Sequence, residues 1–327
     1  MRFIIYGAGG IGGTIGARFF QHGHEVILIA RGEHLRVIQE RGLIFKSPHE
    51  TVTLPIPCFG YPSEIRFQEG DVVFMTMKSQ HTHEALEALR DAAGEDIPVV
   101  CCQNGVANER MALRIFHRVY GMVVLLPASH MEPGIVQTEA KTTTGILDAG
   151  CYPAGTDSII KKVTGILSAS NFDAKADPNV MRWKYAKLLR NIGNSLQALC
   201  EPGEEAQDIS GMMVHEALDC YKAAGIECAS RDEVSNRRAD HIQVGPVDGK
   251  GRGGGSSWQS IARGTGNIEA DYLNGEIVLL GKLHGIATPA NRVLQQLANK
   301  LAKEGDKPGS HSLDHIRQLI TEAGGKF

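Results

Sequence analysis

The chain opens with a strand-like run that leads directly into a glycine-rich turn. Residues 2–6 read RFIIY and residues 7–12 read GAGGIG, followed by a stretch with helical spacing. In such a G-x-G-x-x-G turn, Gly7 permits the tight bend, Gly9 lets the backbone approach a pyrophosphate, and Gly12 lets the helix pack closely on the sheet. The N–H groups at the start of the helix then attract the phosphates. The turn predicts a nucleotide site formed by the following residues: Gly7, Gly9, Gly10, Ile11 and Gly12.

The residue at the end of the second predicted strand indicates which nucleotide binds. An NAD enzyme typically carries Asp or Glu there, about 20 residues after the glycines, to bond the ribose 2′-hydroxyl. Here the strand ends with Ala30 and Arg31. A guanidinium can form a charge-assisted, bidentate pair with a 2′-phosphate, which a carboxylate would repel. We therefore expect NADPH as the cofactor. Glu33 lies nearby, and the alternative is that its carboxylate binds the ribose.

The first half of the chain alternates short apolar runs with amphipathic stretches. Continuous apolar strands separated by helices predict a parallel sheet that is covered on both faces. The predicted strands are residues 2–6, 25–30, 71–76, 99–102 and 120–126, and the predicted helices are residues 11–22, 33–40 and 81–92. Residues 43–55 are expected to form an inserted hairpin.

In the second half, apolar residues recur at three- and four-residue spacing, which is typical of helices. The predicted helices are residues 159–168, 180–199, 209–224 and 268–283. The predicted fold class is α/β, with a Rossmann-type parallel-sheet domain over residues 1–172 and an all-α domain over residues 173–327. The glycine-rich segment 245–257 is predicted as a loop, either a flexible insertion or a lid over a site.

Two further turns follow predicted strands, at the edge where open α/β sheets bind ligands. Met77-Lys78 follows one strand, and Gln103-Asn104 follows the next. Lys78 could add positive charge near the cofactor phosphates, and Asn104 could orient a substrate or the nicotinamide amide. Ordinary loop polarity is the alternative explanation for each residue.

Polar side chains share one face of the predicted helix over residues 180–199. Lys187, Asn191, Asn194 and Ser195 follow i, i+4, i+7, i+8 spacing. An amine and amides among apolar neighbours cost free energy if they are buried without partners. They form either a polar seam against another helix or a site in which Lys187 donates a proton to a ketone, because reduction builds negative charge on the ketone oxygen.

Composition argues against several other classes of protein. The net charge is −3, so no broad basic surface for nucleic acid is expected. No apolar run reaches the ~18 residues of a membrane span. Seven cysteines without C-x-x-C spacing indicate reduced thiols and a cytoplasmic protein. The 13 histidines are dispersed, so no metal site is predicted. Helices of the second half could form a homodimer face, which the sequence leaves open.

These motifs resemble the ketopantoate reductase (2-dehydropantoate 2-reductase) family. The matching pieces are GAGGIG at 7–12, Arg31, the Lys78 turn, QNG at 103–105, Trp183, Lys187 and Asn191 at four-residue steps, Ser257, Glu269, DYLNG and HGIATPAN. They follow the family's order along nearly the whole chain. The resemblance implies an N-terminal Rossmann domain, a helical C-terminal domain and an active site in the cleft between them.

The resemblance also implies roles for individual residues. Lys187 would be the general acid, and hydride would come from C4 of NADPH. Glu269 would act with Lys187 and bind the substrate hydroxyl. The residues implied to hold the substrate are Asn104, Asn191, Asn194, Ser195 and Ser257.

Two departures from the family pattern affect the substrate side. Family members often carry a second asparagine eight residues after the lysine, where this chain has Ser195, preceded by Asn194. The loop from Gly245 to Gly255 is also longer and richer in glycine than the family implies. Lys184 is the alternative acid, and Lys187 is preferred because it keeps the four-residue step to Asn191.

The sequence therefore predicts NADPH-dependent reduction of a small 2-keto acid to a 2-hydroxy acid. The first candidate reaction is ketopantoate to pantoate, in pantothenate biosynthesis. One alternative is a reductase of the same family that acts on a different small oxo-acid. The other is a non-catalytic NADP(H)-binding sensor, although such a protein has no need of a proton donor.

Overall fold

The apolar runs of the first half form strands in the computed structural model, which describes residues 1–201, 206–238, 242–249, 254–264 and 266–327. The strands are β1 (Arg2–Tyr6), β2 (Val26–Ile29), β3 (Leu43–Lys46), β4 (Thr51–Leu54), β5 (Cys58–Phe59), β6 (Asp71–Met75), β7 (Val99–Cys101), β8 (Val119–Met122), β9 (Ala128–Ser129), β10 (Ile135–Thr138) and β11 (Ala149–Cys151). All five predicted strands are present, with ends that differ by a few residues.

The larger sheet has seven strands in the order β11-β8-β7-β6-β1-β2-β5. Its strands pair in parallel, except that β11 pairs with β8 in the antiparallel sense. The chain order reverses at β1, which has β2 on one side and β6 on the other. A smaller sheet, β4-β3-β10-β9, contains the antiparallel pair β3–β4. That pair confirms the hairpin predicted over residues 43–55.

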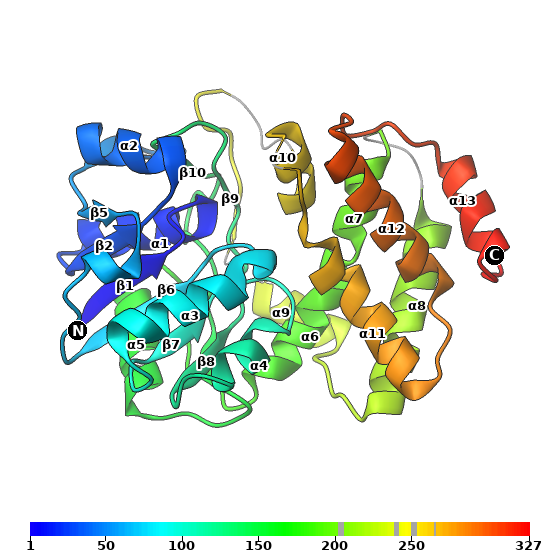
Figure 1. Cartoon of the computed structure of the whole chain (residues 1–327), viewed down its shortest axis with the longest axis horizontal. Helices are drawn as coiled ribbons and strands as arrows, with labels where there is room; N and C mark the ends of the chain where they lie inside the picture. The colour runs from blue at the N-terminus through cyan, green and yellow to red at the C-terminus, as the bar shows by residue number, and fades with distance from the viewer. Residues whose placement is uncertain (202–205, 239–241, 250–253, 265) are drawn as a thin grey trace. The chain divides into compact units, whose positions relative to one another are not determined.

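The described residues of the second half form helices, as the spacing of their apolar residues predicts (Figure 1). The helices are α1 (Gly10–Gln21), α2 (Gly32–Arg41), α3 (Thr82–Ala93), α4 (Asn108–Leu113), α5 (Ser158–Ala169), α6 (Val180–Asn191), α7 (Gly193–Leu199), α8 (Gln207–Ala224), α9 (Arg231–Arg238), α10 (Ser256–Ala262), α11 (Asn274–His284), α12 (Pro289–Glu304) and α13 (Leu313–Glu322). Short 3-10 turns are η1 (Pro62–Glu64), η2 (Ser79–His81) and η3 (Glu269–Tyr272).

Both faces of the larger sheet are covered, as the unbroken apolar strands predict. Successive side chains of a strand point to opposite faces. In β1, Phe3 and Ile5 belong to the core that includes residues of α1, α5 and the smaller sheet. Ile4 and Tyr6 belong to the other core, with residues of α3 and α4. The sheet is thus the middle layer of an α/β domain.

Two predicted helices are each divided in the structure. The helix predicted over residues 180–199 is interrupted at Ile192, between α6 and α7. The helix predicted over residues 268–283 begins as the 3-10 turn η3, and α11 starts only after Leu273. Leu273 has φ −112° and ψ −84°, outside the helical region. Glu269 therefore lies in a 3-10 turn rather than in an α-helix.

By its contacts the chain divides into two compact units. The first contains Met1–Gln103, Asn108–Trp183 and the described residues within Ser230–Arg252. The second contains Asn104–Ala107, Lys184–Ala229 and the described residues within Gly253–Phe327. In the second unit α7 packs against α10 and α12, and α11 packs against α8 and α12. The domain division between residues 172 and 173 stays a prediction.

Helix α9 is attached to the first unit by a buried ion-pair network. The Arg237 guanidinium donates to both carboxylate oxygens of Asp148, at 2.7 Å each. It also donates to both oxygens of Asp173, at 2.5 and 3.0 Å. Asp148 is 1% exposed, and these carboxylates raise the pKa of Arg237. A segment far along the sequence is thereby fixed to the sheet domain.

We expect Arg237→Ala to lower the free energy of unfolding by about 3–5 kcal/mol, because it leaves the buried Asp148 carboxylate without its ion-pair partner. The measurement is the shift of the denaturant-unfolding midpoint followed by circular dichroism. The control is Arg238→Ala, since the neighbouring Arg238 is exposed and should cost less than about 0.5 kcal/mol. A loss for Arg237→Ala as small as that of the control would show that the network contributes nothing to stability.

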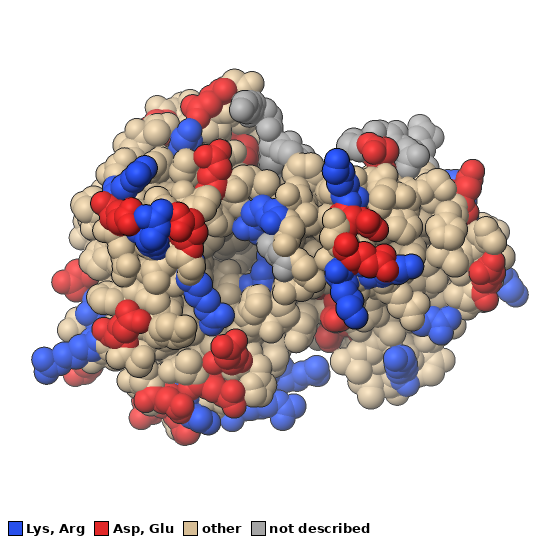
Figure 2. All heavy atoms as spheres, turned by 45° about the horizontal axis from the view of Figure 1, so that its top comes forward, with Lys and Arg blue, Asp and Glu red and all other residues tan. Residues whose placement is uncertain are grey.

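Acidic and basic side chains are interspersed on the face of the protein in Figure 2, in keeping with a net charge of −3. Among the described residues, no helix combines the length and apolar character that a membrane span requires. Within the same residues, no group of three or more His, Cys, Asp or Glu side chains is arranged to hold a metal ion.

Candidate functional site

The glycine turn follows β1 at the point where the strand order reverses. Such a switch point, outside the carboxyl ends of the strands, is where open α/β sheets bind ligands. Gly7 has φ +108°, which L side chains rarely adopt, and a Cβ there would lie 2.7 Å from the Met77 backbone nitrogen. The turn after β1 and the turn after β6 therefore touch through a position that only glycine fits.

The other glycines of the turn divide into those that pack and one that faces open space. A Cβ on Gly12 would overlap the Gly7 carbonyl oxygen and lie 2.8 Å from Ile5 Cγ2, so Gly12 brings α1 close to β1. A Cβ on Gly10 would lie 3.1 Å from the Ser129 backbone. Around Gly9, the N-cap of α1, a Cβ would meet no atom within 4 Å. The N-terminus of α1 thus presents bare backbone to a space that suits a pyrophosphate.

Arg31 lies two residues after the end of β2 at Ile29 and is the N-cap residue of α2. Its guanidinium is half exposed and lies 3.9 Å from the Glu84 carboxylate. Glu33, the alternative ribose-binding acid, is paired instead with Arg36, which lowers the pKa of Glu33. Because the Arg31 side chain is half exposed, an anionic ligand can reach the cation at this position.

Lys78 is the residue before the 3-10 turn η2, just after β6. The register pairs Tyr6 with Met75, the last residues of β1 and β6. The residues that follow both strands therefore leave the sheet at the same edge. Lys78 lies there as the sequence predicts, half-buried, and can contribute positive charge near a phosphate.

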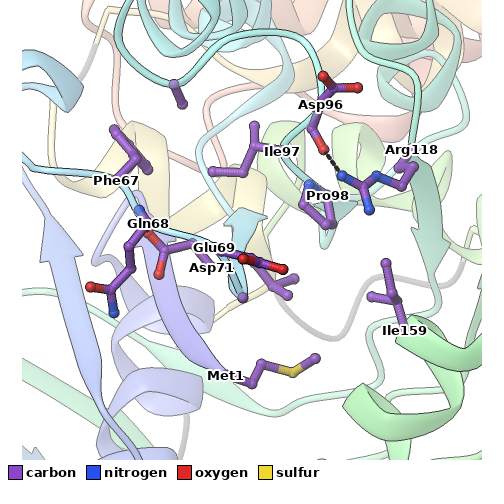
Figure 3. A pocket seen from close by; sticks show the side chains of 13 residues that line it. Met1, Phe67, Gln68, Glu69, Asp71, Asp96, Ile97, Pro98, Arg118 and Ile159 are labelled. Atoms are coloured by element: carbon purple, nitrogen blue, oxygen red, sulfur yellow. Dashed lines mark hydrogen bonds between the residues drawn. The ribbon is translucent and has the colours of Figure 1, made fainter.

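A pocket of about 560 Å³ opens at the opposite edge of the larger sheet (Figure 3). Its lining includes Met1, Asp71, Pro98 and Arg118, which stand at or just before the amino ends of β1, β6, β7 and β8. The Arg118 guanidinium donates to the Asp96 carbonyl oxygen there. Because ligands of this fold bind beyond the carboxyl ends, this pocket is not the candidate nucleotide site.

In the second unit, Lys187 and Asn104 are brought together from positions far apart in the sequence. The Lys187 ammonium, on α6, donates to Asn104 Oδ1 at 2.5 Å. Burial and, to a smaller extent, the like charge of Lys184 lower the pKa of Lys187 from 10.5 to about 7, while the Glu269 carboxylate opposes the shift. An amine with a pKa near neutrality can both hold and release a proton at physiological pH.

The remaining predicted residues lie in three different surroundings. Asn191 is half-buried, and its Oδ1 atom is enclosed with no partner among the described residues. Asn194 lies near Gly255, with its Oδ1 3.5 Å from where a Cβ on Gly255 would stand. Ser257 and Glu269 are each 2% exposed, on α10 and η3. The negative charge of Glu269 raises the pKa of Lys187, against the effect of burial.

The Ser195 side chain has different hydrogen-bond partners from the residues with which it shares helical spacing. It is 0% exposed, and its hydroxyl donates to Asn274 Oδ1 at 2.6 Å. The Asn274 amide in turn donates to the Ile192 carbonyl oxygen and to Asn291 Oδ1, both at 3.1 Å. Ser195 is therefore part of an internal network, and we leave it out of the proposed substrate contacts.

Sequence reasoning missed this network, although two of its members stand in the motifs DYLNG and TPAN. The Asn291 side chain donates to the Met213 carbonyl oxygen and to Glu216 Oε2. The Glu216 carboxylate also accepts from the backbone N–H groups of Ala290 and Asn291, at 2.8 and 3.0 Å, and so caps α12. The signal available in the sequence was an asparagine within each otherwise apolar helix start.

The proposed lid lies partly outside the described residues, which omit 250–253. On one side of that gap, Gly245 N–H donates to the Glu139 carbonyl oxygen at 2.8 Å. On the other side, Gly255 N–H donates to Gln197 Oε1 at 3.0 Å, just before α10. The lid therefore stays a hypothesis.

A parallel sheet with a glycine turn at its switch point, together with a lysine of near-neutral pKa, is typical of dinucleotide-dependent oxidoreductases. The particular family is settled by comparison with known proteins. The family model "Ketopantoate reductase PanE/ApbA" matches residues 3–150, and its C-terminal companion matches residues 179–302. The chain belongs to the ketopantoate reductase family.

Individual relatives extend over nearly the whole chain. A 2-dehydropantoate 2-reductase of Pyrococcus horikoshii is 28% identical over 95% of this chain and all of its own length. The crystal structure of a PanE/ApbA family ketopantoate reductase from Ralstonia eutropha has a TM-score of 0.78 and 28% identity, covering 93% of this chain and 99% of that one. A D-mandelate dehydrogenase, solved with NADH and anilino(oxo)acetate, has a TM-score of 0.80 at 24% identity, covers the same shares of the two chains, and shows likeness of fold.

Proposed function

We propose that this protein reduces a small 2-keto acid to the 2-hydroxy acid with NADPH, with ketopantoate as the first candidate substrate and pantothenate biosynthesis as the pathway. The observation that carries the proposal is the Lys187 ammonium, held on Asn104 with a pKa of about 7. Membership of a reductase family supports the reaction class. The seven free cysteines support a reducing compartment, the cytoplasm.

The nucleotide would be held by the first unit. The glycine turn and the N-terminus of α1 would take the pyrophosphate, Arg31 the 2′-phosphate, and Lys78 would add positive charge. When bound, the nicotinamide supplies the hydride. The open space around Gly9 and the exposed guanidinium of Arg31 both fit this group.

The second unit would supply the proton. Lys187 would donate it to the ketone oxygen, on which negative charge develops during reduction. Asn104 holds the ammonium and would orient it toward the substrate. Glu269 would bind the substrate hydroxyl, and its charge favours the protonated amine. Asn191, Asn194 and Ser257 would hold the rest of the substrate.

The test is NADPH oxidation, followed by absorbance, with ketopantoate, phenylglyoxylate and a series of aliphatic 2-keto acids. We expect turnover with at least one of them, and the highest kcat/KM with ketopantoate. Highest kcat/KM with another keto acid would keep the reaction class and replace the substrate. NADPH binding without turnover of any keto acid would favour the non-catalytic sensor instead.

A further inference from the structure

The imidazole of His34 connects the glycine turn to a second segment of the first unit. His34 lies in the first turn of α2, three residues after Arg31. Its Nε2 is 2.7 Å from the carbonyl oxygen of Ala8, which lies inside the turn between Gly7 and Gly9. Its Nδ1 accepts a hydrogen bond of 2.8 Å from the Gly134 N–H, just before β10. One ring therefore connects three segments.

These two bonds determine which ring nitrogen carries the hydrogen. A backbone N–H can only donate, so Nδ1 must be the acceptor from Gly134. Nε2 then carries the hydrogen and donates it to the Ala8 carbonyl oxygen. His34 thus acts as a neutral ring in a single tautomer, with both nitrogens in use.

Neighbouring side chains hold the ring in this orientation. The His130 ring lies against it, with the two ring centroids 4.1 Å apart, and His130 is itself held by the Ile135 carbonyl oxygen at 3.0 Å. Gly134 has φ +77°, and a Cβ there would overlap Val37 of α2. The segment before β10 therefore packs directly against α2, and the His34 ring has little freedom to turn.

We infer that His34 is a positioning residue that fixes the distance between the glycine turn and Arg31. This inference rests on the proposed function, in which the turn takes the pyrophosphate and Arg31 the 2′-phosphate. A dinucleotide that spans both subsites gains affinity only if their separation matches its own length. His34 sets that separation, because its ring bonds the turn and its backbone belongs to the helix that begins at Arg31.

The test compares ligands that occupy one subsite with a ligand that occupies both. 2′-AMP carries the 2′-phosphate alone, whereas NADPH carries that group and the pyrophosphate. In His34→Ala we expect the Kd of NADPH to rise about tenfold, the effect of one lost hydrogen bond of this kind, while the Kd of 2′-AMP changes less than twofold. Calorimetry measures the first Kd, and displacement of NADPH measures the second.

Two further variants separate positioning from a general loss of structure. His34→Gln places an amide N–H within reach of the Ala8 carbonyl oxygen, and we expect it to restore most of the NADPH affinity. His83→Ala removes an exposed histidine of α3, paired with Glu87, and should change neither Kd. Equal weakening of 2′-AMP and NADPH in His34→Ala, or no weakening of either, would overturn the inference. A wild-type protein that binds no NADPH would instead reject the proposed function, and the inference with it.

Discussion

Replacing Lys187 by alanine is expected to lower kcat for keto-acid reduction by about 10²- to 10⁴-fold, the usual contribution of a positioned general acid. The amine that donates to Asn104 is lost, and the ketone oxygen would then have to take its proton from water. The measurement is steady-state NADPH oxidation with the best keto acid. Unchanged NADPH affinity and circular dichroism would show that the variant is folded.

The pH dependence of the reaction rate is a second test of the Lys187 amine. Reduction requires the protonated form, and the pKa of Lys187 is about 7 in the folded protein. We expect kcat for reduction to fall as the pH rises through about 7, because the donor is then deprotonated. Oxidation of the hydroxy acid needs the neutral amine as a base, so its rate should rise over the same range.

Matched variants of the charged neighbours test whether the titrating group is Lys187. Lys184 is buried and lowers the pKa of Lys187 by like-charge repulsion. Lys184→Met should therefore keep activity and move the falling limb of the reduction profile to higher pH. Glu269→Gln removes an opposite charge and should move the limb to lower pH. Loss of activity in Lys184→Met, with activity kept in Lys187→Ala, would exchange the roles of the two lysines.

The parts of the fold that the sequence predicted are those determined by neighbours along the chain. Residues 2–21 alone predict a strand, a glycine turn and a helix, and the structure has these elements in that order. The same holds for Arg31, whose place at the end of β2 needs only the length of one helix and one strand. Local spacing was enough to predict where the glycine turn and Arg31 lie in the fold.

Contacts between distant residues were beyond such reasoning. Helical spacing put Lys187 and Ser195 on one face, but it could not say which of them would meet Asn274 in the interior. Lys187 donates to Asn104, and its pKa is raised by Glu269, and each of these residues is more than 80 positions away along the chain. His34 is bonded across 100 residues to Gly134. No periodic pattern in the sequence indicates contacts between residues so far apart.

The second large effect concerns the choice of nucleotide. We expect Arg31→Ala to raise the Kd of NADPH roughly 10- to 150-fold, since a hydrogen bond to a charged group contributes about 1.5–3 kcal/mol. The Kd of NADH should change less than threefold, because NADH has a ribose hydroxyl where NADPH has the phosphate. Calorimetry with both nucleotides measures the ratio. The wild-type preference for NADPH should also weaken as salt screens the half-exposed guanidinium.

Arg36→Ala is the matched control for this prediction. Arg36 is an exposed arginine of the same helix, but it is engaged with Glu33 and Glu40, so its loss changes the local charge without removing a phosphate ligand. Equal weakening of both nucleotides in Arg31→Ala would mean that Arg31 supports the nucleotide site as a whole and does not contact the 2′-phosphate. A wild-type preference for NADH would instead direct attention to Glu84, the carboxylate nearest Arg31, as the group that meets the ribose. Only a loss of affinity that is confined to NADPH would show that Arg31 binds the 2′-phosphate.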